Sequence, residues 1–206
     1  MNSPAARITL REAASALQRG DFAAAAAAAS RVLAQAPDDA DALNLLGLAR
    51  FNGGDAQGGI AAAEAAVAAR PGYRNAWDNL IGMLEAAGHA RDAARAALRG
   101  LAARGQTSVD EQCEVAQRCF DAGLLDAAAF AAMPRGSYLV NIARGQHVVE
   151  ADLIAAVQAG QLAGATLDVQ ATEPLPAGDP LWDVPGITIT PHIAGQSSPD
   201  VVAAQF

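Results

Sequence analysis

Residues 137–169 read SYLVNIARGQHVVEADLIAAVQAGQLAGATLDV, and this stretch decides the fold of the second half of the chain. Ser137–Ile142 is a short apolar run of the kind that forms a buried parallel strand. Glu150–Ala159 has apolar residues at helical spacing, and Gly164–Val169 is a second β-prone run. A strand, a helix and a strand in this order predict a βαβ unit with a parallel sheet.

The segments on either side extend this unit. Ile187–Thr190 follows a Pro-Gly turn and is predicted to be a third strand, reached by a long loop. Residues 124–133 (LLDAAAFAAM) are predicted to form a helix that is ended by Pro134–Gly136. A last helix is predicted to begin at Ser198–Asp200 and to run to Phe206. Three strands and one crossover helix make an incomplete doubly wound sheet.

Polar side chains follow the predicted strands where each strand ends. Arg144 follows the first strand, and His192 follows the third. Asp168 closes the second strand, with Glu173 in the loop after it. Sheets of this type bind ligands beyond the carboxyl ends of their strands, so we expect these four side chains to lie along one edge.

This combination of side chains suits the reduction of a 2-oxo acid. The guanidinium of Arg144 is a fixed fork of donors that can hold a carboxylate and a carbonyl. His192 can give a proton to the carbonyl oxygen, and Glu173 beside it would orient the ring and favour its protonated form. Taken singly, each residue has a simpler explanation: a structural ion pair for Arg144, a solvated loop acid for Glu173, and a capping or core role for His192.

The first half of the chain is a repeat of 34 residues. Glycines recur at this spacing, and so do prolines and small residues; they are Gly20, Gly54 and Gly88, Pro37 and Pro71, Ala25, Gly59 and Ala93, and Ala29, Ala63 and Ala97. Thirty-four residues is the length of a helix–turn–helix repeat. The glycine permits a tight turn, the small residues let the second helix approach the first, and the proline ends the pair.

Residues 6–122 resemble the tetratricopeptide repeat family. The third unit carries Trp77, Leu80 and Gly82 before the turn at Gly88 and Ala93 after it. Solenoids of this family offer a groove for a peptide or a partner protein. The residues that fall near such a groove are Asn44, Asn75, Asp78 and Asn79. A scaffold or a dimerisation surface is the alternative interpretation.

Composition restricts the remaining functions. The 206 residues are 52% hydrophobic and 4% aromatic, and all 14 basic residues are arginine. The absence of lysine excludes a lysine Schiff base, and the net charge of −8 disfavours nucleic acid or an anionic membrane as partner. No apolar run reaches the length of a membrane helix, and two cysteines, Cys113 and Cys119, do not make a metal site. We therefore predict a cytoplasmic protein without a metal.

A second resemblance covers the residues from Gly123 onward. The elements N-x-A-R-G, L-D-V-x-x-x-E-P-L-P, P-L-W and T-P-H-I-A occur there in order, and they resemble D-isomer-specific 2-hydroxyacid dehydrogenases of the glyoxylate/hydroxypyruvate reductase branch. The resemblance implies a Rossmann-like domain that binds NAD or NADP and a small 2-oxo or 2-hydroxy acid. The catalytic residues that it implies are Arg144, Glu173 and His192. The cofactor-binding residues that it implies are Ala143, Arg144, Asp168, His192 and Gly195.

Two unlike domains are therefore predicted, residues 1–122 of helical repeats and residues 123–206 of a partial NAD(P)-binding domain. The Gly-x-Gly-x-x-Gly turn that holds a pyrophosphate at a helix N-terminus does not occur in the sequence. We accordingly expect little or no turnover by this polypeptide alone. Two alternatives stay open: a repeat scaffold with an inactive dehydrogenase remnant, and the product of a gene fusion or truncation. Homodimerisation is expected by analogy with related enzymes.

Overall fold

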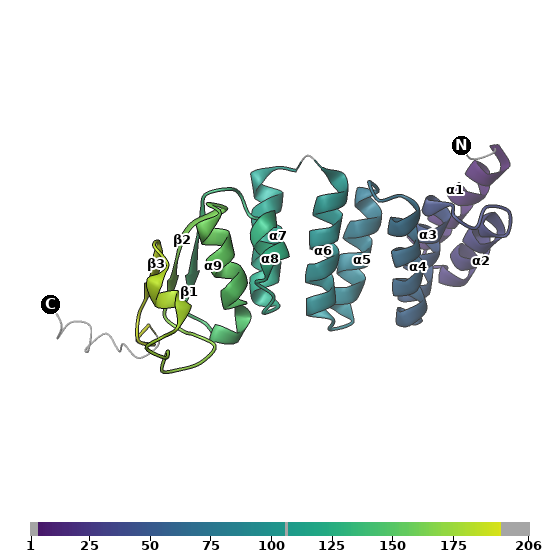
Figure 1. Cartoon of the computed structure of the whole chain (residues 1–206). Coiled ribbons are helices and arrows are strands. Elements are labelled where there is room, and N and C mark those ends of the chain that lie inside the picture. The colour runs from purple at the N-terminus through teal and green to yellow at the C-terminus, as the bar shows by residue number, and fades with distance from the viewer. Residues whose placement is uncertain (1–3, 106, 195–206) are drawn as a thin grey trace. The chain divides into compact units, whose positions relative to one another are not determined.

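The computed structural model describes residues 4–105 and 107–194 and divides the chain into two compact units, Met1–Gln106 and Thr107–Phe206 (Figure 1). The division lies before the helix of residues 109–121, whereas the predicted boundary after residue 122 placed this helix with the repeats. This helix contacts the helix that follows it, within the second unit.

The first unit consists of three helical hairpins. Their helices are α1 (Pro4–Gln18), α2 (Phe22–Leu33), α3 (Ala40–Asn52), α4 (Ala56–Ala69), α5 (Arg74–Ala86) and α6 (Ala90–Arg104). The turn within each hairpin contains one of the repeat glycines, with φ of 75° at Gly20, 97° at Gly54 and 80° at Gly88. Since residues with a Cβ rarely adopt this left-handed conformation, the 34-residue glycine spacing is explained by the turns.

Small residues let the helices of the second hairpin approach closely. A Cβ placed on Gly59 of α4 would lie 2.7 Å from Cβ of Phe51 and 2.9 Å from the carbonyl oxygen of Gly47, both in α3. In the third hairpin, Trp77 and Leu80 are buried in a core with Ala93. Gly82, by contrast, has open space where a Cβ would be. The predicted helix–turn–helix repeats are confirmed.

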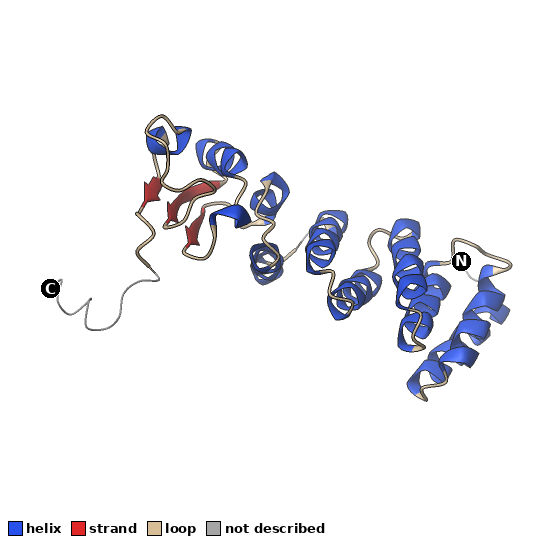
Figure 2. Ribbon diagram, turned by 90° about the horizontal axis from the view of Figure 1, so that it is seen from below, coloured by secondary structure: helices blue, strands red, loops and turns tan. Residues whose placement is uncertain are grey.

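The second unit places helices against a small parallel sheet. Its elements are α7 (Val109–Asp121), α8 (Ala127–Ala132), β1 (Ser137–Asn141), the 3₁₀ turn η1 (Gly145–His147), α9 (Glu150–Gln158), β2 (Leu162–Leu167), the 3₁₀ turn η2 (Pro180–Asp183) and β3 (Ile187–Ile189). The strand order is β1-β2-β3, and both pairs are parallel. Figure 2 shows the three strands side by side. Leu153 and Val157 of α9 are buried, and α9 contacts β2, so the predicted βαβ unit is confirmed.

Several boundaries differ from the predicted ones. β2 begins at Leu162, two residues before the predicted start, because Gly160 (φ 66°) ends α9 and the chain enters the sheet at once. β2 also ends earlier, at Leu167, since Asp168 uses its side chain in the turn beyond the sheet. α8 begins only at Ala127, after the Asp126 cap. The helix predicted after Ser198 lies outside the described residues.

No helix within residues 4–105 or 107–194 combines the length and the hydrophobicity that a membrane crossing requires.

Candidate functional site

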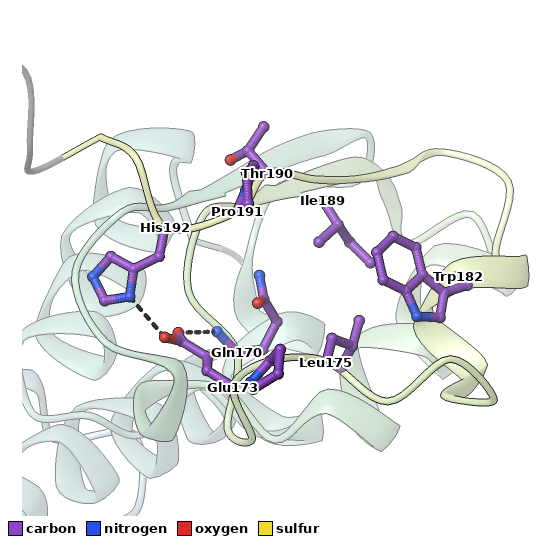
Figure 3. A pocket seen from close by; sticks show the side chains of 9 residues that line it. Gln170, Glu173, Leu175, Trp182, Ile189, Thr190, Pro191 and His192 are labelled. Atoms are coloured by element: carbon purple, nitrogen blue, oxygen red, sulfur yellow. Dashed lines mark hydrogen bonds and ion pairs between the residues drawn. The ribbon is translucent and has the colours of Figure 1, made fainter.

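His192 and Glu173 form a hydrogen-bonded pair beyond the carboxyl ends of the strands. Nδ1 of His192 lies 2.7 Å from Oε2 of Glu173, and Figure 3 shows this contact as a dashed line. The other oxygen of Glu173 accepts a hydrogen bond from the backbone N–H of Gln170 (3.0 Å), which fixes the carboxylate. The hydrogen bond from His192, followed by that from Gln170, holds the pKa of Glu173 below its ordinary value. The contact with Glu173 uses Nδ1 of the ring and not Nε2.

Asp168 holds the turn that carries His192. His192 has φ of 53°, the left-handed region that residues with a Cβ seldom adopt. The carboxylate of Asp168, only 2% exposed, accepts hydrogen bonds from the hydroxyl of Thr190 (2.5 Å) and from the backbone N–H groups of Ile193 (3.0 Å) and Ala194 (2.8 Å). These donors lie on both sides of His192, so the turn is fixed before and after the ring.

The pKa of Asp168 reflects the same contacts. Burial alone would raise it, but the hydrogen bonds from Thr190, Ala194 and Ile193 and the charge of His192 together lower it. Asp168 is therefore a carboxylate at neutral pH.

Arg144 lies in the turn after β1 and is exposed. Its Nη1 donates to the carbonyl of Ala143 (2.6 Å), and no carboxylate pairs with it among the residues that the structure describes. A structural ion pair thus does not account for it. The turn is held by Asn141, the first residue of the N-x-A-R-G element. The motif predicted no role for it, because the bonds of a buried amide to nearby backbone cannot be read from residue spacing.

A pocket of about 630 Å³ adjoins the His192–Glu173 pair. Its polar lining includes Gln170, and its apolar wall includes Leu175, Trp182 and Ile189. In Figure 3 the ring of His192 lies at one side of the pocket and Trp182 at the opposite side. The site thus joins the His192–Glu173 pair to a largely apolar cavity.

The other predicted residues have varied surroundings. The N–H of Ala143 donates to Oδ1 of Asn141 (3.1 Å), and Gly195 lies outside the described residues. In the first unit, Asn44 is buried and accepts a hydrogen bond from Nδ2 of Asn79 (2.9 Å). Of the other two groove residues, Asn75 is exposed, and Asp78 pairs with Arg74 at 3.8 Å.

Comparison with protein families separates the two halves. Residues 120–194 match the model of the D-isomer specific 2-hydroxyacid dehydrogenase NAD binding domain. Residues 10–74 match the model of the tetratricopeptide repeat. The chain is thus similar to tetratricopeptide repeats in its first half and to a dehydrogenase NAD-binding domain in its second.

Individual proteins similar to the second half of the chain are glyoxylate/hydroxypyruvate reductases. The chain is 51% identical over 84 residues to glyoxylate/hydroxypyruvate reductase A of Yersinia enterocolitica, and 52% identical over 85 residues to that of Serratia proteamaculans. Each alignment covers 41% of this chain and 27% of the relative, so the chain spans about a quarter of the length of these curated relatives. The C-terminal segment is therefore similar to glyoxylate/hydroxypyruvate reductases.

A similar solved structure is a D-isomer specific 2-hydroxyacid dehydrogenase from Xanthobacter autotrophicus Py2 in complex with NADPH and MES. It is 48% identical, with a TM-score of 0.36, and the match covers 40% of this chain and 34% of that one.

Proposed function

We propose that the second unit carries the substrate-binding and proton-transfer residues of an NAD(P)-linked reductase of small 2-oxo acids such as glyoxylate or hydroxypyruvate. The observation that carries the proposal is the 2.7 Å contact between His192 Nδ1 and Glu173 Oε2. It gives the imidazole a defined orientation, which general acid catalysis requires. The high identity to glyoxylate/hydroxypyruvate reductases supports the same substrate class.

The roles follow from the chemistry of each side chain. Arg144 would bind the substrate carboxylate through two parallel N–H bonds. His192 would donate the proton on Nε2 to the carbonyl oxygen, and Glu173 would stabilise the imidazolium before the transfer. A reduced nicotinamide, when bound, supplies the hydride that adds to the carbonyl carbon. Carbonyl, hydride and proton together give the 2-hydroxy acid, and His192 is left neutral.

The residues at the strand ends fit the nicotinamide end of the cofactor, NAD or NADP. A carboxylate accepts about four hydrogen bonds, and Asp168 accepts three from the protein. One acceptor position on Oδ2 thus remains for a donor such as a carboxamide. Ala143 and Arg144 are the further proposed contacts. The sequence has no glycine-rich pyrophosphate turn, so we expect weak cofactor binding and turnover below about 1 per second.

The test is the oxidation of NADPH and of NADH by the full chain in the presence of glyoxylate or hydroxypyruvate. His192→Ala should lower the substrate-dependent rate by about 100-fold or to background, since general acid catalysis contributes at least that much. His89→Ala is the matched control, because this exposed histidine lies in the first unit near Asp92. A substrate-dependent rate above background that His192→Ala leaves unchanged would overturn the proposal.

For the first unit we propose a protein or peptide partner in the repeat groove. Asn75 and Asp78 are exposed, with Asp78 in a surface pair with Arg74, whereas Asn44 and Asn79 bond to each other. Capture experiments with the full chain and with an Asn75→Ala/Asp78→Ala variant test this role. A partner retained equally by both would argue against the groove.

A further inference from the structure

Asn141 is the last residue of β1, and its side chain is completely buried (0% exposed). A buried amide is costly unless its polar atoms are bonded. Here both are: Oδ1 accepts the N–H of Ala143 (3.1 Å), and Nδ2 donates to the carbonyl of Arg144 (2.9 Å). One side chain therefore fixes the backbone on both sides of the Ala143–Arg144 peptide.

The same turn packs directly on the loop that carries Glu173. A Cβ on Gly145 would collide with the backbone carbonyl of Gln170 and with the N–H of Ala171. The carbonyl of Asn141 also accepts the N–H of Asp168 (2.9 Å), which ties the end of β1 to the end of β2. The backbone of Arg144 thus has little freedom to move relative to the His192–Glu173 pair.

We propose that Asn141 is a positioning residue that directs Arg144 toward the carboxylate of the 2-oxo acid; this inference rests on the proposed function. Since Asn141 is fully buried, it acts through the turn and not by touching the substrate. Bidentate binding of a carboxylate needs a guanidinium in a defined plane, and a displacement of about 1 Å is enough to weaken such a site strongly.

Two variants separate the two bonds. Asn141→Ala removes both of them. Asn141→Asp keeps an acceptor for the N–H of Ala143 but puts a carboxylate oxygen in place of the N–H₂ group that donates to the carbonyl of Arg144. The matched control is Gln161→Ala, because Nε2 of Gln161 also bonds two backbone carbonyls, those of Phe130 (3.0 Å) and Met133 (2.9 Å), in the same unit.

The first measurement is the dissociation constant of oxamate, a stable 2-oxo acid mimic, from the full-length chain by NMR titration. We expect both Asn141 variants to weaken oxamate binding about tenfold or more, and Gln161→Ala to change it less than about twofold. The second measurement is amide hydrogen exchange at Ala143. Exchange should be about tenfold faster in Asn141→Ala and near wild type in Asn141→Asp.

The outcomes distinguish the two proposals. Wild-type oxamate affinity in both Asn141 variants would overturn the positioning role. If the wild-type chain binds no oxamate, the proposed function fails. In that case the amide exchange of Ala143 still tests the positioning role: unchanged exchange in Asn141→Ala overturns it, and faster exchange supports it. Gly145→Ala serves as a second disturbance of the turn if Asn141→Ala does not fold, and oxamate affinity equal to wild type in that variant would also contradict the inference.

Discussion

His192 adopts the left-handed backbone conformation that is usual for glycine, and the hydrogen bonds of Asp168 stabilise the turn in this conformation. A single buried carboxylate bonds to donors on both sides of the ring and leaves Nδ1 facing Glu173. Position along the strand predicted Asp168 as a residue of the site. Its three bonds to the turn of residues 190–194 were not predictable, since they depend on how that turn folds back over the end of β2.

Asp168→Asn tests this support of the His192 turn. An asparagine turns one acceptor oxygen into an N–H donor that faces another donor, so we expect the turn to loosen and His192 to leave Glu173. The pKa of Glu173 should then rise toward its ordinary value, because the bond from His192 is the main cause of its lowering. Loss of the Asp168 charge alone would lower the pKa of Glu173. A rise in this pKa therefore indicates that His192 has left Glu173, and a fall indicates only the lost charge.

Carbon-13 NMR of the glutamate carboxyl groups measures this pKa. Asp183→Asn, which alters an exposed carboxylate in η2, is the control and should leave it unchanged. A Glu173 pKa that stays put or falls in Asp168→Asn would contradict the role of Asp168.

The two carboxylates also predict an acid dependence of stability. In the folded protein the pKa values of Asp168 and Glu173 lie below their ordinary values of 3.8 and 4.5. Both carboxylates therefore stabilise the fold fully above these ordinary values, and the stabilisation is lost as the pH falls toward the folded pKa values. The unfolding temperature of the second unit should therefore decrease below about pH 4.5, and less steeply in Asp168→Asn. Parallel curves for wild type and variant would contradict this linkage.

Within the repeats, two glycines with opposite surroundings provide a matched test. Gly59→Ala forces a Cβ against Phe51 and the backbone of Gly47, and should destabilise the first unit by about 1–3 kcal/mol. Gly82→Ala places a Cβ in open space within α5 and should stabilise it by about 0.5–1 kcal/mol. Urea unfolding followed by circular dichroism measures both. Equal effects of the two substitutions would show that close helix packing at Gly59 is not important.

The elements were predictable to different degrees. The hairpins followed from the 34-residue spacing, because a left-handed turn residue and small contact residues leave a periodic trace, as at Gly54 and Gly59. The strands followed from short β-prone runs. The unit to which α7 belongs did not follow, because assignment to a domain depends on contacts that residue spacing does not record. The contact of Gly145 with the backbone of Gln170 could not be predicted from the sequence for the same reason.

The whole chain contains two tryptophans, one in each unit, and they permit separate observation of the units. Trp77 is buried in the first unit, and Trp182 lines the pocket of the second. In protein labelled with 5-fluorotryptophan, we expect two fluorine resonances with distinct thermal transitions. Gly59→Ala should lower the transition temperature reported by Trp77 only. Gly145→Ala should lower the transition temperature reported by Trp182 only. Resonances that always shift together would argue against two independently folded units.

The proposed reductase site requires that Arg144 and His192 address one bound 2-oxo acid. The most direct test is an oxamate titration of the full chain with labelled histidine. The chain has three histidines, and His89, which lies in the first unit, serves as the internal reference. We predict that the His192 ring resonances shift with a saturable dependence on oxamate while those of His89 do not. Arg144→Lys, which keeps the charge but loses the planar fork, should weaken this response about tenfold or more. A His192 resonance that oxamate does not move, or one that responds equally in Arg144→Lys, would contradict the proposed site.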